Sequence, residues 1–185
     1  LVALPFAALH PEFAPWLVAA GVSGGLLPDV DVVRGHRRLL HYPVALPPVA
    51  LAVVALALAS GDVVVSVVGV AVSASALHSL MDVCGGGLGL RPWRSGERAV
   101  YDHVRGRWLS PRRGVRYDGA PEDLALSFAL AVPAVYYFDF ARLFVFGALA
   151  VSAAYAVLRK PLADEVESLL DIVDTGGWTP AWVRE

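Results

Sequence analysis

Residues 43–81 read PVALPPVALAVVALALASGDVVVSVVGVAVSASALHSLM, and no other stretch says as much about the architecture of this chain. It contains two runs of 19 residues without Asp, Glu, Lys or Arg, Pro43–Gly61 and Val63–Met81. The apolar core of a bilayer is about 30 Å thick, and a helix needs about 20 apolar residues to cross it. Only the turn Ser60-Gly61-Asp62 joins the two runs. We therefore predict two antiparallel membrane-spanning helices, with Asp62 as the N-cap of the second.

The rest of the chain has the composition of a membrane protein. Of the 185 residues, 57% are hydrophobic and 17% charged, whereas a soluble domain has about 25% charged residues. Four shorter apolar runs are present: Leu1–Leu9, Phe13–Pro28, Leu124–Phe138 and Leu143–Leu158. A buried helix of a soluble bundle is a reasonable alternative for one such run, but a poor one for the two adjacent longer runs. We predict a single all-α domain over residues 1–185, a polytopic transmembrane bundle of about five helices whose first helix is truncated.

Basic residues lie almost entirely on one side of this predicted bundle. If the spans alternate in direction, residues 29–42, 82–123 and 159–185 share one face, and they hold 14 of the 15 lysines and arginines. Cytoplasmic loops are enriched in basic residues, so we expect a multi-pass protein of the cell inner (plasma) membrane with this face in the cytoplasm. Residues 82–123 are then an arginine-rich cytoplasmic loop of about 40 residues. Residues 159–185 are a cytoplasmic tail, acidic and amphipathic over Asp164–Asp174.

Histidine and aspartate side chains gather on the same face. Six of them flank the ends of predicted helices: Asp29, Asp31, His36, His41, His78 and Asp82. Because a helical hairpin is antiparallel, His78 and Asp82 return to the level of His41. These two residues are four apart and share one helix face, the spacing by which two helical side chains bind one metal ion. His10 is expected at the opposite face.

This set of side chains favours a divalent metal ion. Imidazole plus carboxylate suits zinc, and also manganese or iron, and such an ion lowers the pKa of a bound water to about 7. We expect Asp29, Asp82, His41 and His78 to converge within about 8 Å of a common centre, with His36 and Asp31 at its edge. Asp29-Val30-Asp31 is expected to be an extended turn, in which one or both carboxylates reach the ion.

Each of these residues also has an ordinary structural explanation. A single histidine at a membrane edge is usually interfacial, and Asp29 or Asp31 alone could cap a helix or solvate a turn. Their convergence is harder to explain in this way, because ionisable groups close to the hydrocarbon cost energy and tend to mark functional sites.

Three pieces of the sequence, in order, resemble one known family. They are Leu27–Asp31, His36–His41 and His78–Asp82, followed by Pro92-Trp93. Their pattern, L-P-D-x-D, H-R-x-x-x-H and H-x-x-x-D, is similar to that of the YdjM-like family of membrane-bound metal-dependent hydrolases, over about residues 21–95. The resemblance implies that Asp29, Asp31, His36, His41, His78 and Asp82 are the metal ligands. The family is distantly similar to zinc-dependent phospholipase C and P1-type nucleases, which implies hydrolysis of a phosphoester.

The sequence departs from the family pattern at three places. The family has a histidine near its N-terminus, at the start of the first helix, and we expect that ligand to precede Leu1. Leu40 stands where the family usually has Thr, and Tyr42-Pro43 replaces the usual Ser.

Further polar residues on this face have two possible roles. Arg37 and Arg38 could hold a phosphate bidentately, or bind inner-leaflet lipid and set the topology. Asp102-His103 could supply a general acid, but we favour a place in an amphipathic interfacial helix. Trp93 and Trp108 are typical interface anchors, and Cys84 lies near the cluster without support as a ligand.

These observations predict a membrane-bound metal-dependent hydrolase that acts on a phosphoester or lipid through a metal-activated water, with Asp29, Asp31 and Arg37 as catalytic residues. The alternative is a non-catalytic membrane protein whose cytoplasmic face binds anionic lipid or a protein partner. An ion transporter is disfavoured, because the ionisable groups lie at the face and not in mid-membrane. The expected partners are membrane lipid and a small-molecule or lipid phosphoester; no nucleic-acid motif is evident, and the sequence does not specify the oligomeric state.

Overall fold

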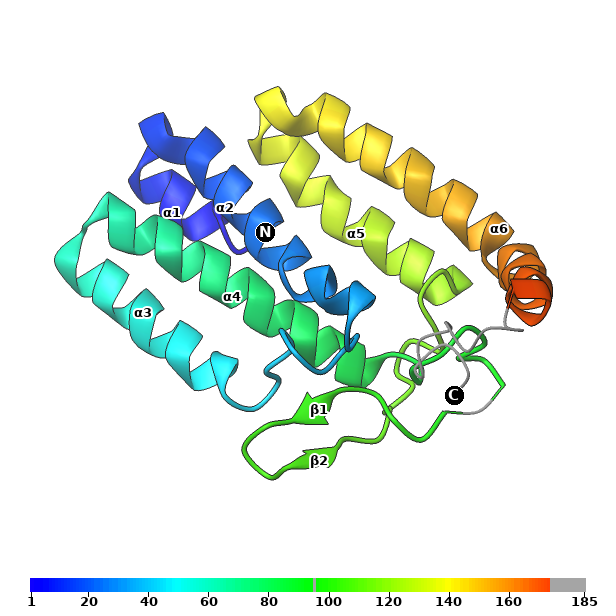
Figure 1. The fold of residues 1–185 in the computed structure, drawn as a ribbon. Coiled ribbons are helices and arrows are strands. Elements are labelled where there is room, and N and C mark those ends of the chain that lie inside the picture. The colour runs from blue at the N-terminus through cyan, green and yellow to red at the C-terminus, as the bar shows by residue number, and fades with distance from the viewer. Residues whose placement is uncertain (95, 174–185) are drawn as a thin grey trace. The chain divides into compact units, whose positions relative to one another are not determined.

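The structure is a computed structural model that describes residues 1–94 and 96–173, most of them helical (Figure 1). The chain divides into two compact units. The first comprises Leu1–Val83 with Val100–Leu109, and the second comprises Cys84–Ala99 with Ser110–Glu185.

The first unit contains the predicted helical hairpin. Its helices and strands are α1 (Leu4–Leu9), α2 (Ala14–Leu26), α3 (Leu46–Ser60), α4 (Val63–Cys84), β1 (Tyr101–Asp102) and β2 (Arg107–Trp108), with 3-10 turns η1 (Pro11–Phe13) and η2 (Pro28–Val33). Gly61, with a φ of 64°, ends α3 in the left-handed conformation that glycine adopts without strain. The Asp62 carboxylate accepts the N–H groups of Val64 and Val65 at 2.8 and 3.0 Å, which confirms Asp62 as the N-cap of α4.

Small residues let the helices of the first unit approach closely. A Cβ on Gly24 of α2 would lie 2.1 Å from the carbonyl oxygen of Ala71 on α4. On α4, Gly69 faces Val53 and Val54 of α3. Close packing of small residues is the usual way in which membrane helices associate, because lipid offers no hydrophobic drive between them. The contacts hold α4 against both α2 and α3 and so fix the level at which their ends meet.

Residues 100–109 form a β-hairpin where we favoured an interfacial helix, so that prediction is wrong and the fold is not purely all-α. Tyr101 pairs with Trp108, and Asp102 with Arg107, in antiparallel register. The reason is local. Gly106 adopts a φ of 65°, a turn conformation that closes two short strands and would interrupt a helix.

The second unit contains α5 (Pro121–Tyr137), η3 (Asp139–Ala141) and α6 (Arg142–Val173). Pro133 lies inside α5, as expected. The last apolar run, Leu143–Leu158, lies within a longer helix, since α6 continues through Pro161. The Lys160 ammonium lies 5.6 Å from the centre of the Tyr117 ring, a contact that holds a charged side chain without ending the helix. The structure does not describe residues 174–185. It also does not describe the side chains of Leu170 and Val173, two apolar positions of the predicted amphipathic tail.

Three helical segments are long and apolar enough to cross a membrane: Pro11–Val32, Val63–Cys84 and Asp139–Leu169. This supports a helical membrane protein. The predicted count of about five spans is not confirmed, because α3 has 15 residues and α5 has 17. The predicted loop 82–123 is also shorter, since α4 extends to Cys84 and α5 begins at Pro121.

Candidate metal centre

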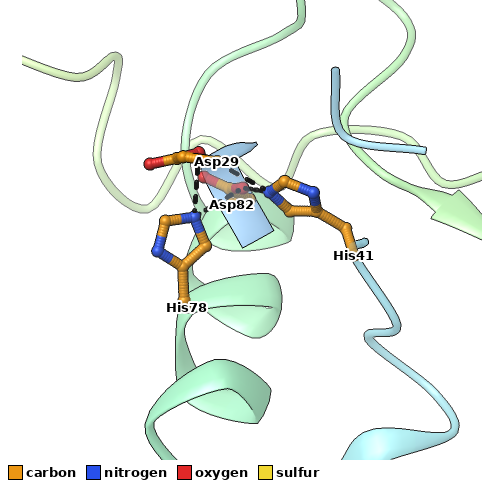
Figure 2. A group of neighbouring side chains, drawn as sticks. All are labelled: Asp29, His41, His78 and Asp82. Atoms are coloured by element: carbon orange, nitrogen blue, oxygen red, sulfur yellow. Dashed lines mark ion pairs between the residues drawn. The ribbon is translucent and has the colours of Figure 1, made fainter. Parts of the chain in front are cut away.

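Two aspartates and two histidines of the first unit point at one another. Asp29 comes from η2, His41 from the segment before α3, and His78 and Asp82 from the end of α4 (Figure 2). One nitrogen or oxygen atom from each lies within 4.8 Å of the others. The His41 and His78 ring centres are 5.3 Å apart. The predicted convergence of these four residues is therefore confirmed.

The distances within the group suit a shared metal ion. The Nε2 atom of His41 lies 3.0 Å from Asp82 Oδ2 and 3.8 Å from Asp29 Oδ1. The Nε2 atom of His78 lies 3.3 Å from Asp29 Oδ1 and 3.5 Å from Asp82 Oδ2. Two ligands at about 2.1 Å from one tetrahedral ion are separated by about 3.4 Å. The four side chains thus already have the spacing of one coordination shell.

Three atoms at the centre of the group lack hydrogen bonds. The Nε2 atoms of His41 and His78 and the Oδ2 atom of Asp82 are buried and make none in the described part of the chain. Buried polar atoms are normally hydrogen-bonded, because leaving one unsatisfied costs free energy. A cation at the point that they face would satisfy all three. The residues present therefore fit a divalent metal ion.

Asp31 lies behind His41, outside the four converging residues. It is 4% exposed, and its Oδ2 atom accepts the Nδ1–H of His41 at 3.0 Å and the Leu40 N–H at 3.1 Å. Its Oδ1 atom accepts the Arg37 N–H at 3.2 Å and lies 3.3 Å from His36 Nδ1. A carboxylate behind a metal-binding histidine fixes the ring and directs its other nitrogen at the ion. Asp31 and His36 therefore lie at the edge of the cluster, as expected.

The 3-10 conformation of η2 explains why Asp29 and Asp31 separate. In an extended segment, residues two apart lie on the same side. In a 3-10 helix, with three residues per turn, they differ by about 240°. The extended turn predicted at Asp29-Val30-Asp31 is therefore wrong. One carboxylate faces the cluster and the other faces the site loop, which we define as residues 34–42.

The site loop also contains His36 and three arginines, Arg34, Arg37 and Arg38. Burial lowers the pKa of His36, and the neighbouring Arg37 guanidinium lowers it further, against the opposite effect of Asp31. The ring lies within hydrogen-bond distance of Asp31. Arg37 places its guanidinium 3.3 Å from Asp82 Oδ1. Arg38 instead lies over the Tyr101 ring, 4.8 Å from its centre, so of these two arginines Arg37 is the one at the cluster.

Two supporting residues were not predicted from the sequence. Ser79 is fully buried on α4, accepts the Tyr42 N–H at 3.3 Å and donates to the Ser75 carbonyl at 3.1 Å. This hydrogen bond joins Tyr42, which follows His41, to Ser79, which follows His78. The signal in the sequence is the small-residue spacing of Ser75 and Ser79 on one face of α4.

The cluster is open on one side. The side chain of Asp29 is 50% exposed, while His41 is fully buried. Structural zinc sites are closed and rich in cysteine, whereas catalytic sites keep a position for water or substrate. Cys84 is exposed and is not in the group. The group thus combines His and Asp side chains with one open side.

The chain was compared with protein families, curated proteins and solved structures. None of them matches. Its function is therefore inferred from the geometry of the cluster.

Proposed function

We propose that this chain is a membrane-bound, divalent-metal-dependent hydrolase that acts on a phosphoester or lipid. The observation that carries the proposal is the group Asp29, His41, His78 and Asp82, in which three buried polar atoms without hydrogen bonds face one point. Zinc suits these ligands best, with manganese and iron as alternatives. The resemblance of the same residues to the YdjM-like family agrees with this chemistry.

Each residue has a defined part in the proposed reaction. The four converging side chains would hold the ion, which when bound supplies Lewis acidity and lowers the pKa of water to about 7. Asp31 accepts the Nδ1–H of His41 and so favours the tautomer whose Nε2 would bind the ion. Arg37 offsets the charge of Asp82 and would contact a phosphoryl oxygen. Asp29 contributes Oδ1 to the group, so its other carboxylate oxygen would accept a proton from the attacking water.

Phosphodiester hydrolysis tests this proposal. The full-length protein in detergent, stripped of metal, is expected to cleave bis(p-nitrophenyl) phosphate only after Zn²⁺ or Mn²⁺ is restored. H78A should remain at background, and H10A should match the wild type. If the wild type binds metal yet cleaves neither this ester nor a phospholipid, the hydrolase proposal fails. Retained binding of H78A to anionic lipid would then favour the non-catalytic alternative.

We also propose that the cluster faces the cytoplasm from the inner membrane. The support is the unequal count of basic residues and the position of Asp29 and Asp82 near the ends of two spans, Pro11–Val32 and Val63–Cys84.

Cysteine labelling in intact cells tests this orientation. In a C84S background, S110C is expected to resist an impermeant thiol reagent, and S60C in the α3–α4 turn is expected to react. Permeabilised cells, in which both should react, are the control. The reverse pattern in intact cells would contradict the orientation.

A further inference from the structure

The site loop has no regular secondary structure of its own, yet it contains His36, Arg37 and His41. Within it Arg37 adopts a φ of 59°, a left-handed conformation that is uncommon outside glycine. Such a conformation persists only where the surrounding structure imposes it. The contacts that hold this loop therefore also determine the direction of His41.

Arg37 is held from two sides through its own backbone. Its N–H donates to Asp31 at 3.2 Å, and its carbonyl accepts the N–H of Tyr101 on β1 at 2.9 Å. The next carbonyl, of Arg38, accepts the Nε2–H of His103. Asp31 thus fixes one side of the loop, and the β-hairpin fixes the other.

Ring contacts extend this attachment to the end of the loop. The His103 ring stacks on Tyr42, with centres 4.6 Å apart and planes 30° apart. Tyr42 directly follows His41 and is tied through its N–H to Ser79 on α4. His103 therefore contacts the loop at two places, one on each side of Leu39–His41.

The β-hairpin has its own internal support. The fully buried Asp102 carboxylate accepts the N–H groups of Val104 and Arg105 at 2.9 and 3.2 Å and the Arg105 guanidinium at 2.9 Å. Beyond the strands, the Leu109 N–H donates to Val100 at 2.9 Å. Asp102 is thus a structural residue, which leaves His103 as the member of the pair directed at the loop.

We propose that the β-hairpin is a clamp on the site loop and that His103 is a positioning residue of the metal centre. The role of His103 at the metal centre rests on the proposed function. Its role in ordering the site loop does not. His103 donates to the Arg38 carbonyl and so holds the turn at Arg37 in place. The Arg37 N–H in turn donates to Asp31, and Asp31 accepts the Nδ1–H of His41 and fixes the direction of that ring. This role requires an N–H donor at position 103. A ring that only stacks on Tyr42 would not hold the loop.

Two variants of His103 in the full chain separate these contributions. H103F keeps a ring beside Tyr42 and loses the donor, and H103Q keeps an N–H donor and loses the ring. Hydrogen exchange over residues 34–42 is measured first in metal-free protein. H103F is expected to raise the exchange rates by about 2- to 10-fold, the loss of one hydrogen bond, and H103Q to stay near the wild type. R107Q, an exposed change on β2, is the control.

Zn²⁺ affinity, measured by competition with a chromophoric chelator, gives the second readout. H103F is expected to bind Zn²⁺ about 2- to 10-fold more weakly, and H103Q to bind it as the wild type does. Unchanged exchange in H103F, or equal losses in H103F and H103Q, would overturn the clamp. If the wild type binds no Zn²⁺ but the exchange difference holds, the metal centre is rejected and the clamp on the loop is supported.

Discussion

H78A is expected to bind divalent metal at least about 100-fold more weakly than the wild type. This loss is larger than that expected for a residue that only supports a metal ligand. His78 faces both carboxylates of the cluster, at 3.3 Å from Asp29 and 3.5 Å from Asp82. Its removal deletes one of four ligands and leaves two carboxylates without their shared partner. Elemental analysis of purified protein and Zn²⁺ titration measure the effect.

H10A is the matched control for this loss. His10 ends α1, before α2 begins, and is separated from the cluster by a helix that rises 1.5 Å per residue, on the order of 25 Å in all. It is expected to retain full metal binding. An equal loss in H10A and H78A would contradict the antiparallel arrangement of the site.

Thermal unfolding distinguishes a metal centre from a network of ion pairs. A metal ion at 100 times its Kd stabilises the folded state by about 2.7 kcal/mol. Zn²⁺ should therefore raise the Tm of the wild type and leave that of H78A unchanged. A cluster of ion pairs alone would give H78A a lower Tm with or without chelator, and no response to Zn²⁺ in either protein.

G24A is expected to lower the free energy of unfolding by about 1–3 kcal/mol or more, the cost of overpacking a filled interior. The added Cβ would lie 2.1 Å from the Ala71 carbonyl oxygen. Because the obstacle is the backbone of α4, the strain can be relieved only by moving α2 away from α4. That movement would also shift Asp29 relative to His78, so weaker metal binding is expected with the lower Tm.

The neighbouring glycine provides the control. A Cβ on Gly25 would meet nothing within 4 Å, and alanine is favoured over glycine in a helix by up to about 1 kcal/mol. G25A is thus expected to be neutral or stabilising in the same detergent. Thermal unfolding of both variants measures the difference, and equal Tm values would show that α2 and α4 do not touch at Gly24.

The sequence was most informative where the controlling interactions are local. The α3–α4 hairpin follows from the length of two apolar runs and from Gly61 and Asp62 between them. The approach of His78 and Asp82 to His41 follows from the same hairpin, because antiparallel helices joined by a short turn must bring their far ends together. These features depend on the lengths of two adjacent helices and on the residues of the turn between them.

Other features depend on contacts that the sequence does not show. The last apolar run, Leu143–Leu158, is followed by Arg159, Lys160 and Pro161, and α6 continues through all three. Rings from distant segments support the two cations, with Trp93 lying 5.2 Å from the Arg159 guanidinium. Contacts between residues so far apart in the chain have no signature in helix periodicity or charge.

The sequence by itself predicted a helical protein with apolar helices long enough to cross a membrane, and six His and Asp side chains on one face, four of which converge. Only the tertiary structure decided what each polar residue does there. Asp29 and Asp31 are alike in composition and two residues apart, but η2 turns one to the cluster and the other to the backbone of the site loop. Asp102 and His103 likewise separate into a turn residue and a loop contact. The physical reason is that a carboxylate or an imidazole acquires its role from the donors and acceptors around it. The folded chain brings these from as near as 2 positions away, for Asp102, to as far as 65 positions away, for His103.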